Sequence, residues 1–219
     1  MRIEISNQIR ETCPQLTLAI ITCEVKNSNT SPELWSEMEV EIGRFSNLFS
    51  LEEINKRPEI AATRRIYKSL GKDPNRYRPS AEALCRRIVR GIPIYQVCTL
   101  VDIINLVSIR SGFSIGGFDI DKIKGNIELV VGTKKDEFDA IGRGLLNVEG
   151  LPLYSDEIGG IGTPTSDNER TKISENTRKL LLILNGFSGK SGLPDAANHA
   201  IKLLGKYAEL KEYRLEWLN

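Results

Sequence analysis

The chain has 219 residues, 40% of them hydrophobic, and 30 Lys and Arg residues nearly balance 29 Asp and Glu residues, as is ordinary for a soluble globular protein. No apolar run reaches the ~18 residues of a membrane span, and the N-terminus lacks the apolar stretch of a signal peptide. Four scattered cysteines and one histidine match no zinc motif, so we expect no metal, no cofactor, no membrane contact and a cytoplasmic location.

The spacing of apolar residues predicts a mixture of strands and helices. In chain order these are strands at 2–6 and 16–25, helices at 32–45, 58–70, 80–90 and 100–111, strands at 113–119, 127–131, 145–154 and 178–185, a helix at 194–207 and an edge strand at 211–218. Ser31 followed by Pro32 is a typical helix start, and Gly112 a typical helix end. Thr99 and Asp102 are expected to form a capping box.

Basic residues gather between Lys56 and Arg90. This segment holds eleven Lys or Arg residues against three acids, so it carries a charge of +8 and the remainder carries −7. Such asymmetry points to a polyanionic partner. The alternative is a pair of solvated helix faces. The residues we expect to contact RNA phosphates are Arg64, Arg65, Lys68, Arg76, Arg78, Arg86, Arg87 and Arg90. Tyr67 and Tyr77 are the aromatics available for base stacking.

The stretch 151–171 (L-P-L-Y-S-D-E-I-G-G-I-G-T-P-T-S-D-N-E-R-T) is the leading functional candidate. Its glycines and prolines disfavour helix and regular strand, so we expect a fixed loop. Free backbone amides and hydroxyl groups in such a loop could surround an oxyanion. The alternative is an ordinary long surface loop.

Three weaker motifs are interpreted as structural features and not as functional sites. His199 is the only histidine and lies in a predicted helix, where no catalytic partner is evident. The G-F-S-G-K-S-G loop at 186–192 lacks the spacing of a phosphate loop and reads as a glycine-rich turn. Asp119 and Asp121 are expected to accept hydrogen bonds from turn amides at a strand end, instead of holding a metal.

Residues 99–125 (T-L-V-D-I-I-N-L-V-S-I-R-S-G-F-S-I-G-G-F-D-I-D-K-I-K-G) resemble a segment of the phenylalanyl-tRNA synthetase beta subunit that contains G-Q-P-L-H-A-F-D. Residues 162–171 with the strand at 180–184, and residues 78–88, are similar to freestanding relatives of that subunit's B3/B4 domain, the module that carries the editing site. The resemblance covers about residues 60 to 190. It implies a single α+β domain over 1–219 with an antiparallel β-barrel-like sheet core ringed by helices, and no aminoacylation.

In that family the module binds the acceptor end of tRNA and hydrolyses the ester of a wrongly attached amino acid. This reaction needs a positioned water, backbone donors for the oxyanion and a selective pocket, so a chain poor in histidine could perform it. No catalytic residue is assigned. The resemblance implies a substrate pocket formed by Gly116, Gly160, Gly162, Thr163, Thr165, Ser166, Asp167 and Ile183.

The sequence departs from the synthetase at two pocket positions. Gly116 stands where the synthetase motif has histidine, and Ile183 stands where it has an acid that recognises a phenolic hydroxyl. The resemblance therefore does not support selection of mischarged tyrosine, and Ile183 would favour a smaller or less polar group.

Three functions follow from these patterns. The first is RNA binding, with the tRNA acceptor end or aminoacyl-tRNA as the partner and deacylation of mischarged aminoacyl-tRNA in trans as the candidate activity. The second is a non-catalytic tRNA or protein adaptor, and the third is a hydrolase of small aminoacyl esters. The first requires that the basic segment and the 159–167 loop flank one cavity. It also predicts weaker RNA binding when charge is removed at Arg64, Arg65, Arg86 and Arg87.

Overall fold

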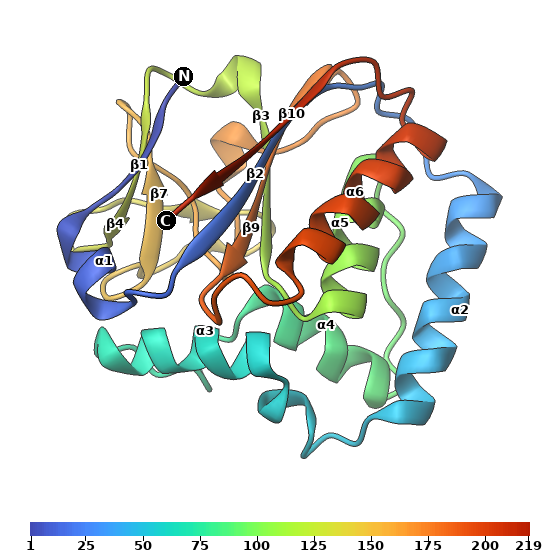
Figure 1. The fold of residues 1–219 in the computed structure, drawn as a ribbon, viewed down its shortest axis with the longest axis horizontal. Helices are drawn as coiled ribbons and strands as arrows, with labels where there is room; N and C mark the ends of the chain where they lie inside the picture. The colour runs from blue at the N-terminus through green and yellow to red at the C-terminus, as the bar shows by residue number, and fades with distance from the viewer.

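The computed structural model describes residues 1–219 and contains two four-stranded sheets that face each other (Figure 1). Sheet 1 has the order β1-β4-β7-β8, with bounds Ile3–Ile5, Ile127–Val131, Pro152–Ser155 and Gly160–Gly162. Sheet 2 has the order β10-β2-β9-β3, with bounds Tyr213–Leu218, Thr17–Glu24, Lys179–Gly186 and Ile115–Asp119. A short separate hairpin pairs β5 (Asp139–Ala140) with β6 (Gly144–Leu145).

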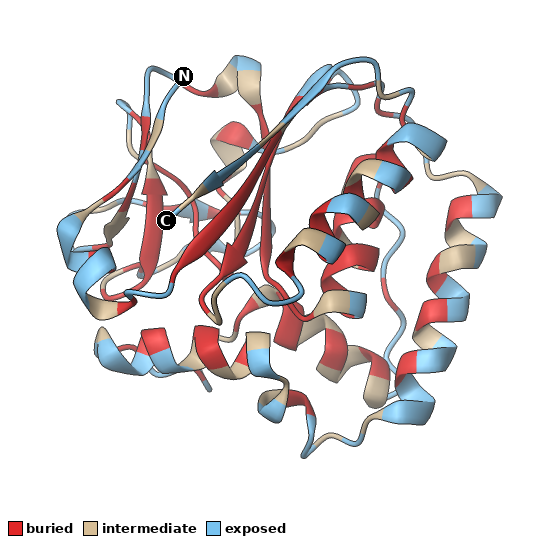
Figure 2. Ribbon diagram, in the orientation of Figure 1, coloured by how far each residue is buried: buried red, intermediate tan, exposed pale blue.

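Strands β2 and β9 are apolar on both faces and therefore occupy the centre of sheet 2. Their alternate side chains enter two different cores: Ile21 and Leu182 belong to the core on the helix side, and Ile20 and Ile183 to the core between the two sheets. Figure 2 shows both strands buried, whereas β10 at the edge is largely exposed. Every pair in sheet 2 is antiparallel, and Ile183 lies opposite both Ile20 and Gly116.

Two helices, α5 (Thr99–Ser111) and α6 (Leu193–Tyr207), pack on the outer face of sheet 2, and α2 (Pro32–Leu48) and α4 (Ser80–Val89) pack against α5 (Figure 1). The Ser31 hydroxyl accepts a hydrogen bond from the Leu34 N–H at 3.3 Å, as the predicted cap requires. Gly112 ends α5 at φ 86°, a conformation that costs glycine little.

Two further helices contact the core between the sheets. These are α1 (Asn7–Thr12), which contributes Ile9, and α3 (Pro58–Ser69), which contributes Ala62, Ile66 and Tyr67. In sheet 1, β1 and β4 run parallel, while β4-β7 and β7-β8 are antiparallel. None of the helices has the length and apolar character needed to cross a membrane.

The α+β class and the largely antiparallel sheet core are confirmed, but the sheets do not close into a barrel. The stretch 151–171 is not a strand-free loop, because β7, β8 and a short 3-10 helix (Glu169–Thr171) lie within it. The strand predicted at 145–154 is instead two short strands, β6 and β7. Thr99 is not a cap: its N–H donates to Ser28, and Asp102 accepts hydrogen bonds from the Val97 N–H and the Thr30 hydroxyl.

Candidate functional site

The turn at residues 163–166 follows β8 and bonds largely to itself. The Thr163 hydroxyl accepts hydrogen bonds from the N–H groups of Thr165 and Ser166, both at 3.1 Å, and donates to the Ser166 carbonyl at 3.1 Å. The Thr163 N–H donates to the same carbonyl at 2.9 Å. These amides and this hydroxyl are therefore engaged within the turn, and are not free to surround an oxyanion.

This turn also packs against the basic segment. The hydroxyl groups of Tyr67 on α3 and Thr165 lie 2.9 Å apart, and the Ser80 N–H at the start of α4 donates to the Pro164 carbonyl at 2.8 Å. Tyr67 is fully buried, so our expectation that its ring is available for stacking was wrong. The two segments that the sequence singled out nevertheless lie side by side.

A hollow of about 310 Å³ opens where these two segments meet. This volume lies at the lower end of the range for small-ligand sites. The hollow, called here the Thr165 hollow, is lined by Arg76, Tyr77, Arg143, Leu145, Leu146, Asn147 and Thr165. Arg76 and Arg143 are both exposed, and neither takes part in any of the chain's ion pairs.

Lys72 holds two walls of the Thr165 hollow together. Its ammonium group donates to the backbone carbonyls of Asn147 at 2.7 Å and Glu149 at 2.6 Å, and burial lowers the pKa of Lys72. The same group lies 3.8 Å from the centre of the half-buried Tyr77 ring, and the Arg76 guanidinium lies 5.6 Å from it. The aromatic wall is therefore fixed by contacts that do not require a ligand.

Three of the predicted RNA-binding arginines converge on one buried acid. The Glu82 side chain is fully buried, and its carboxylate lies 2.7 Å from Arg86, 2.9 Å from Arg64 and 3.6 Å from Arg78. Loss of either partner of such a buried ion pair is strongly destabilising, because the remaining buried charge is left unpaired. Arg64 and Arg86 thus have a structural partner, and removing them would perturb stability as well as charge.

The other basic residues of the segment lie apart from this cluster. Arg65, Lys68 and Arg90 are exposed. The Arg87 guanidinium donates to the Pro93 carbonyl at 2.5 Å and lies 4.4 Å from the centre of the Tyr95 ring. Of the eight residues predicted to contact RNA, only Arg76 lines the Thr165 hollow.

Four of the predicted pocket residues, Gly116, Gly162, Asp167 and Ile183, lie close to Phe118, a residue that was not predicted to be part of a site. A Cβ atom at Gly116 would lie 2.7 Å from the ring of Phe118, and one at Gly162 would lie 2.6 Å from the same ring. Phe118 is fully buried, as is Ile183 opposite Gly116. The glycine at position 116 thus admits the Phe118 ring, which fills the space beside both glycines. Gly160 instead packs close to Leu153 and Phe138.

Asp167 is the fourth of these residues and carries unusual electrostatics. One carboxylate oxygen accepts a hydrogen bond from the Gly117 N–H at 3.1 Å, and the other lies beside Gly162. Burial raises the pKa of Asp167 to about 7, because a single amide donor does not replace the lost hydration of the carboxylate. Burial and the nearby Asp167 charge raise the pKa of Tyr154, whose hydroxyl donates to Asn185 at 2.6 Å.

Sequence reasoning missed two residues of these sites. Arg143 lies between Gly142 and Gly144, both at positive φ, so the G-R-G pattern could have indicated a tight turn that presents a basic side chain. Phe118 gave no functional signal, because a phenylalanine in a strand is expected in any core. The turn-amide expectation is confirmed for Asp119, whose carboxylate accepts a hydrogen bond from the Asp121 N–H at 3.2 Å; the Asp121 carboxylate instead lies 3.4 Å from the Lys179 ammonium.

A second hollow, of about 570 Å³, lies on the helical side of the molecule. His199 and Lys202 on α6, Arg110 on α5 and Glu37 on α2 are among its lining residues. Burial and the nearby Arg110 lower the pKa of His199. The exposed Lys206 is paired with Glu37 at 2.6 Å. His199 lines this hollow, but none of the residues predicted to contact RNA or to form the substrate pocket does.

Comparison with known proteins gives one family and a similar solved structure. The model of a family described as the B3/4 domain matches residues 62–208. An N-terminal fragment of the phenylalanyl-tRNA synthetase beta subunit from Pyrococcus horikoshii is similar at 15% identity and a TM-score of 0.45, over 93% of this chain and 49% of that chain. The chain thus spans about half the length of that fragment. No curated protein sequence matches the chain.

Proposed function

The chain belongs to the B3/4 domain family, and on that premise we propose that it binds RNA, with the acceptor end of tRNA as the ligand and the Thr165 hollow as the contact site. The observation that carries this proposal is the hollow itself, which joins the basic segment to the 163–166 turn. Two unpaired arginines and a half-exposed tyrosine beside one cavity suit a single-stranded nucleotide.

Each wall of the hollow has a part in this binding. Arg76 and Arg143 attract phosphates, because each is exposed and has no acidic partner. Tyr77 offers a ring face to a base, and the 84% exposed Leu145 offers an apolar contact to a base or ribose. Asn147 and Thr165, whose hydroxyl lies 2.9 Å from that of Tyr67, are the uncharged polar residues that line the hollow beside Tyr77.

Binding is tested by fluorescence anisotropy with a labelled RNA hairpin that ends in a single-stranded 3′ extension. We expect the extension to bind more tightly than a blunt hairpin of the same stem. Tyr77→Leu should weaken binding of the extended RNA by about tenfold, because base stacking is worth about 1–3 kcal/mol per base. Tyr95→Leu, at an exposed tyrosine that lies beside Arg87 and does not line the hollow, is the matched control. Equal affinity for the two hairpins would refute the proposal.

Asp167 favours a second function, deacylation of mischarged aminoacyl-tRNA in trans. A carboxyl group with a pKa of about 7 can act as a general base at neutral pH, and it lies beside two of the family's pocket positions. The position of Phe118 argues against deacylation, because its ring fills the space beside Gly116 and Gly162 and would have to move to admit an aminoacyl group. That packing favours the non-catalytic adaptor.

A deacylation assay across mischarged tRNAs separates these functions. Release of amino acid by the wild type and its loss in Asp167→Asn, with RNA affinity unchanged, would establish hydrolysis. RNA binding without release would identify the adaptor. Cleavage of a free amino-acid ester that persists in the presence of excess tRNA would instead identify a small-ester hydrolase.

A further inference from the structure

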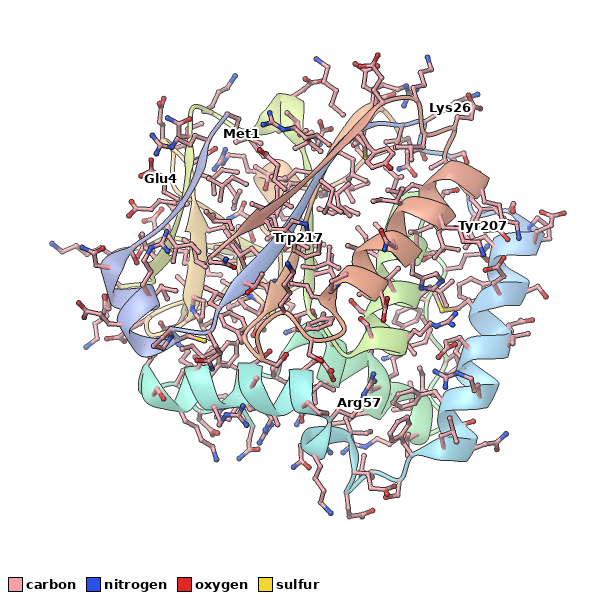
Figure 3. All side chains as sticks on the ribbon, in the orientation of Figure 1. Met1, Glu4, Lys26, Arg57, Tyr207 and Trp217 are labelled. Atoms are coloured by element: carbon pink, nitrogen blue, oxygen red, sulfur yellow. The ribbon has the colours of Figure 1, made fainter.

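Strand β10 forms an open edge of sheet 2. It pairs with β2 on one side only, and no strand follows it in the sheet order. Its residues are largely exposed: Tyr213 retains 53% of its surface and Trp217, seen on the strand in Figure 3, retains 37%. Long edge strands that carry exposed apolar side chains commonly pair with another chain, because their outward amides and carbonyls lack partners.

The hydrogen-bond pattern shows which residues of β10 face outward. The Glu24 N–H donates to the Glu212 carbonyl at 2.9 Å, and the register places Arg214 opposite Thr22. In an antiparallel ladder, every second residue directs both its N–H and its C=O to the same neighbour. The backbone groups of Arg214 and Glu216 therefore face β2. Those of Tyr213, Leu215 and Trp217 face away from it.

The side chains of β10 are self-complementary around Leu215. If two copies of the strand are laid antiparallel with Leu215 opposite Leu215, Arg214 of each copy lies opposite Glu216 of the other, and Tyr213 opposite Trp217. The outward-facing residues then meet one another, so the required backbone hydrogen bonds can form. Arg214 and Glu216 fall at the non-hydrogen-bonded positions, where facing side chains are closest. Their side chains already share one face, 2.8 Å apart within the chain.

The charges also select this register over its neighbours. Centring the pair on Arg214 would place Arg214 opposite its own copy and Glu212 opposite Glu216. Centring it on Glu216 would place two glutamates opposite each other. Like charges directly opposite are destabilising, so the arrangement around Leu215 is favoured over these two registers.

We propose that two copies of this chain associate through β10, as an antiparallel strand pair with its two-fold axis at Leu215. Sheet 2 of one copy then continues into sheet 2 of the other copy, and both copies use the same surface for the contact. The exposed Tyr213 and Trp217 rings become neighbours across the interface on the helix side of the sheet, where the Lys190 ammonium lies 5.4 Å from the Trp217 ring. This inference does not depend on the proposed RNA binding.

Charge exchange between the strands tests the proposal. Sedimentation equilibrium should give a dimer for the wild type. Arg214→Glu and Glu216→Arg should each raise the dimer dissociation constant by about tenfold or more, because both cross-strand pairs become like-charged. The double variant restores both pairs and should dimerise like the wild type. An equimolar mixture of the two single variants should form a heterodimer.

A backbone variant provides an independent test. Leu215→Pro removes an N–H that faces away from β2, so the pairing with β2 keeps all its hydrogen bonds, whereas both hydrogen bonds between the two copies of residue 215 are lost. We expect a folded monomer, with the circular dichroism of the wild type. A wild type that stays monomeric would overturn the proposal. So would variants that all stay dimeric, or a folded double variant that fails to dimerise.

Discussion

Replacing Asp167 with asparagine should change how stability depends on pH. Burial raises the pKa of the Asp167 carboxyl group from its ordinary value of 3.8 to about 7 in the folded chain. The folded state thus holds this proton more tightly than the unfolded state does. The protonated Asp167 therefore contributes stability to the folded chain that is fully present below about pH 4. This contribution is lost as the pH rises through about 7, because the buried carboxylate must then ionise.

The size of the effect follows from the gap between the two pKa values. At 1.36 kcal/mol per pKa unit, the wild type should lose on the order of 4 kcal/mol of unfolding free energy between about pH 4 and about pH 8 relative to Asp167→Asn. Urea denaturation of the wild type and of Asp167→Asn across this range measures the difference in unfolding free energy. The contributions of all other titrating groups cancel in that difference. A difference that stays constant with pH would refute the burial argument.

The remaining predictions concern packing and charge. Glu82→Gln leaves the Arg64 guanidinium without its buried carboxylate and should lower the unfolding free energy by about 3 kcal/mol in urea denaturation; a change within error would show that the cluster is solvated. Gly116→Ala should lower the unfolding free energy by about 1–3 kcal/mol, because its Cβ would lie 2.7 Å from the Phe118 ring. When Phe118→Leu is added to this variant, the total loss of unfolding free energy should be smaller than the sum of the losses in the two single variants. Gly112→Ala should cost about 1 kcal/mol, because φ is 86° there; an unchanged melting temperature would contradict the strain argument.

The elements were largely predictable because each carries a local signal. The apolar runs at 16–25 and 178–185 indicated β2 and β9, and both lie at the centre of a sheet with apolar contacts on each face. Ser31 and Gly112 marked helix ends, since a capping hydroxyl and a left-handed glycine act within one turn.

The failures arise where distant residues decide the outcome. Strand β8 contains only Gly160, Ile161 and Gly162, and pairing with β7 overrides the poor strand preference of glycine. The role of Glu82 was hidden because Arg64, eighteen positions earlier in the sequence, reaches it only after α3 and α4 pack together. In the same way, the filling of the space beside Gly116 depends on how the two sheets face each other.

The most direct test of the RNA-binding proposal is the salt dependence of affinity. Arg76→Ala with Arg143→Ala should weaken binding of the extended hairpin and reduce the slope of log affinity against log salt by about 1.4, because each single-strand phosphate contact contributes about 0.7. The control, Lys26→Ala with Lys211→Ala, removes the same charge from exposed positions beside α6 and β10 and should keep the wild-type slope. Equal slopes for the two double variants would contradict binding at the Thr165 hollow.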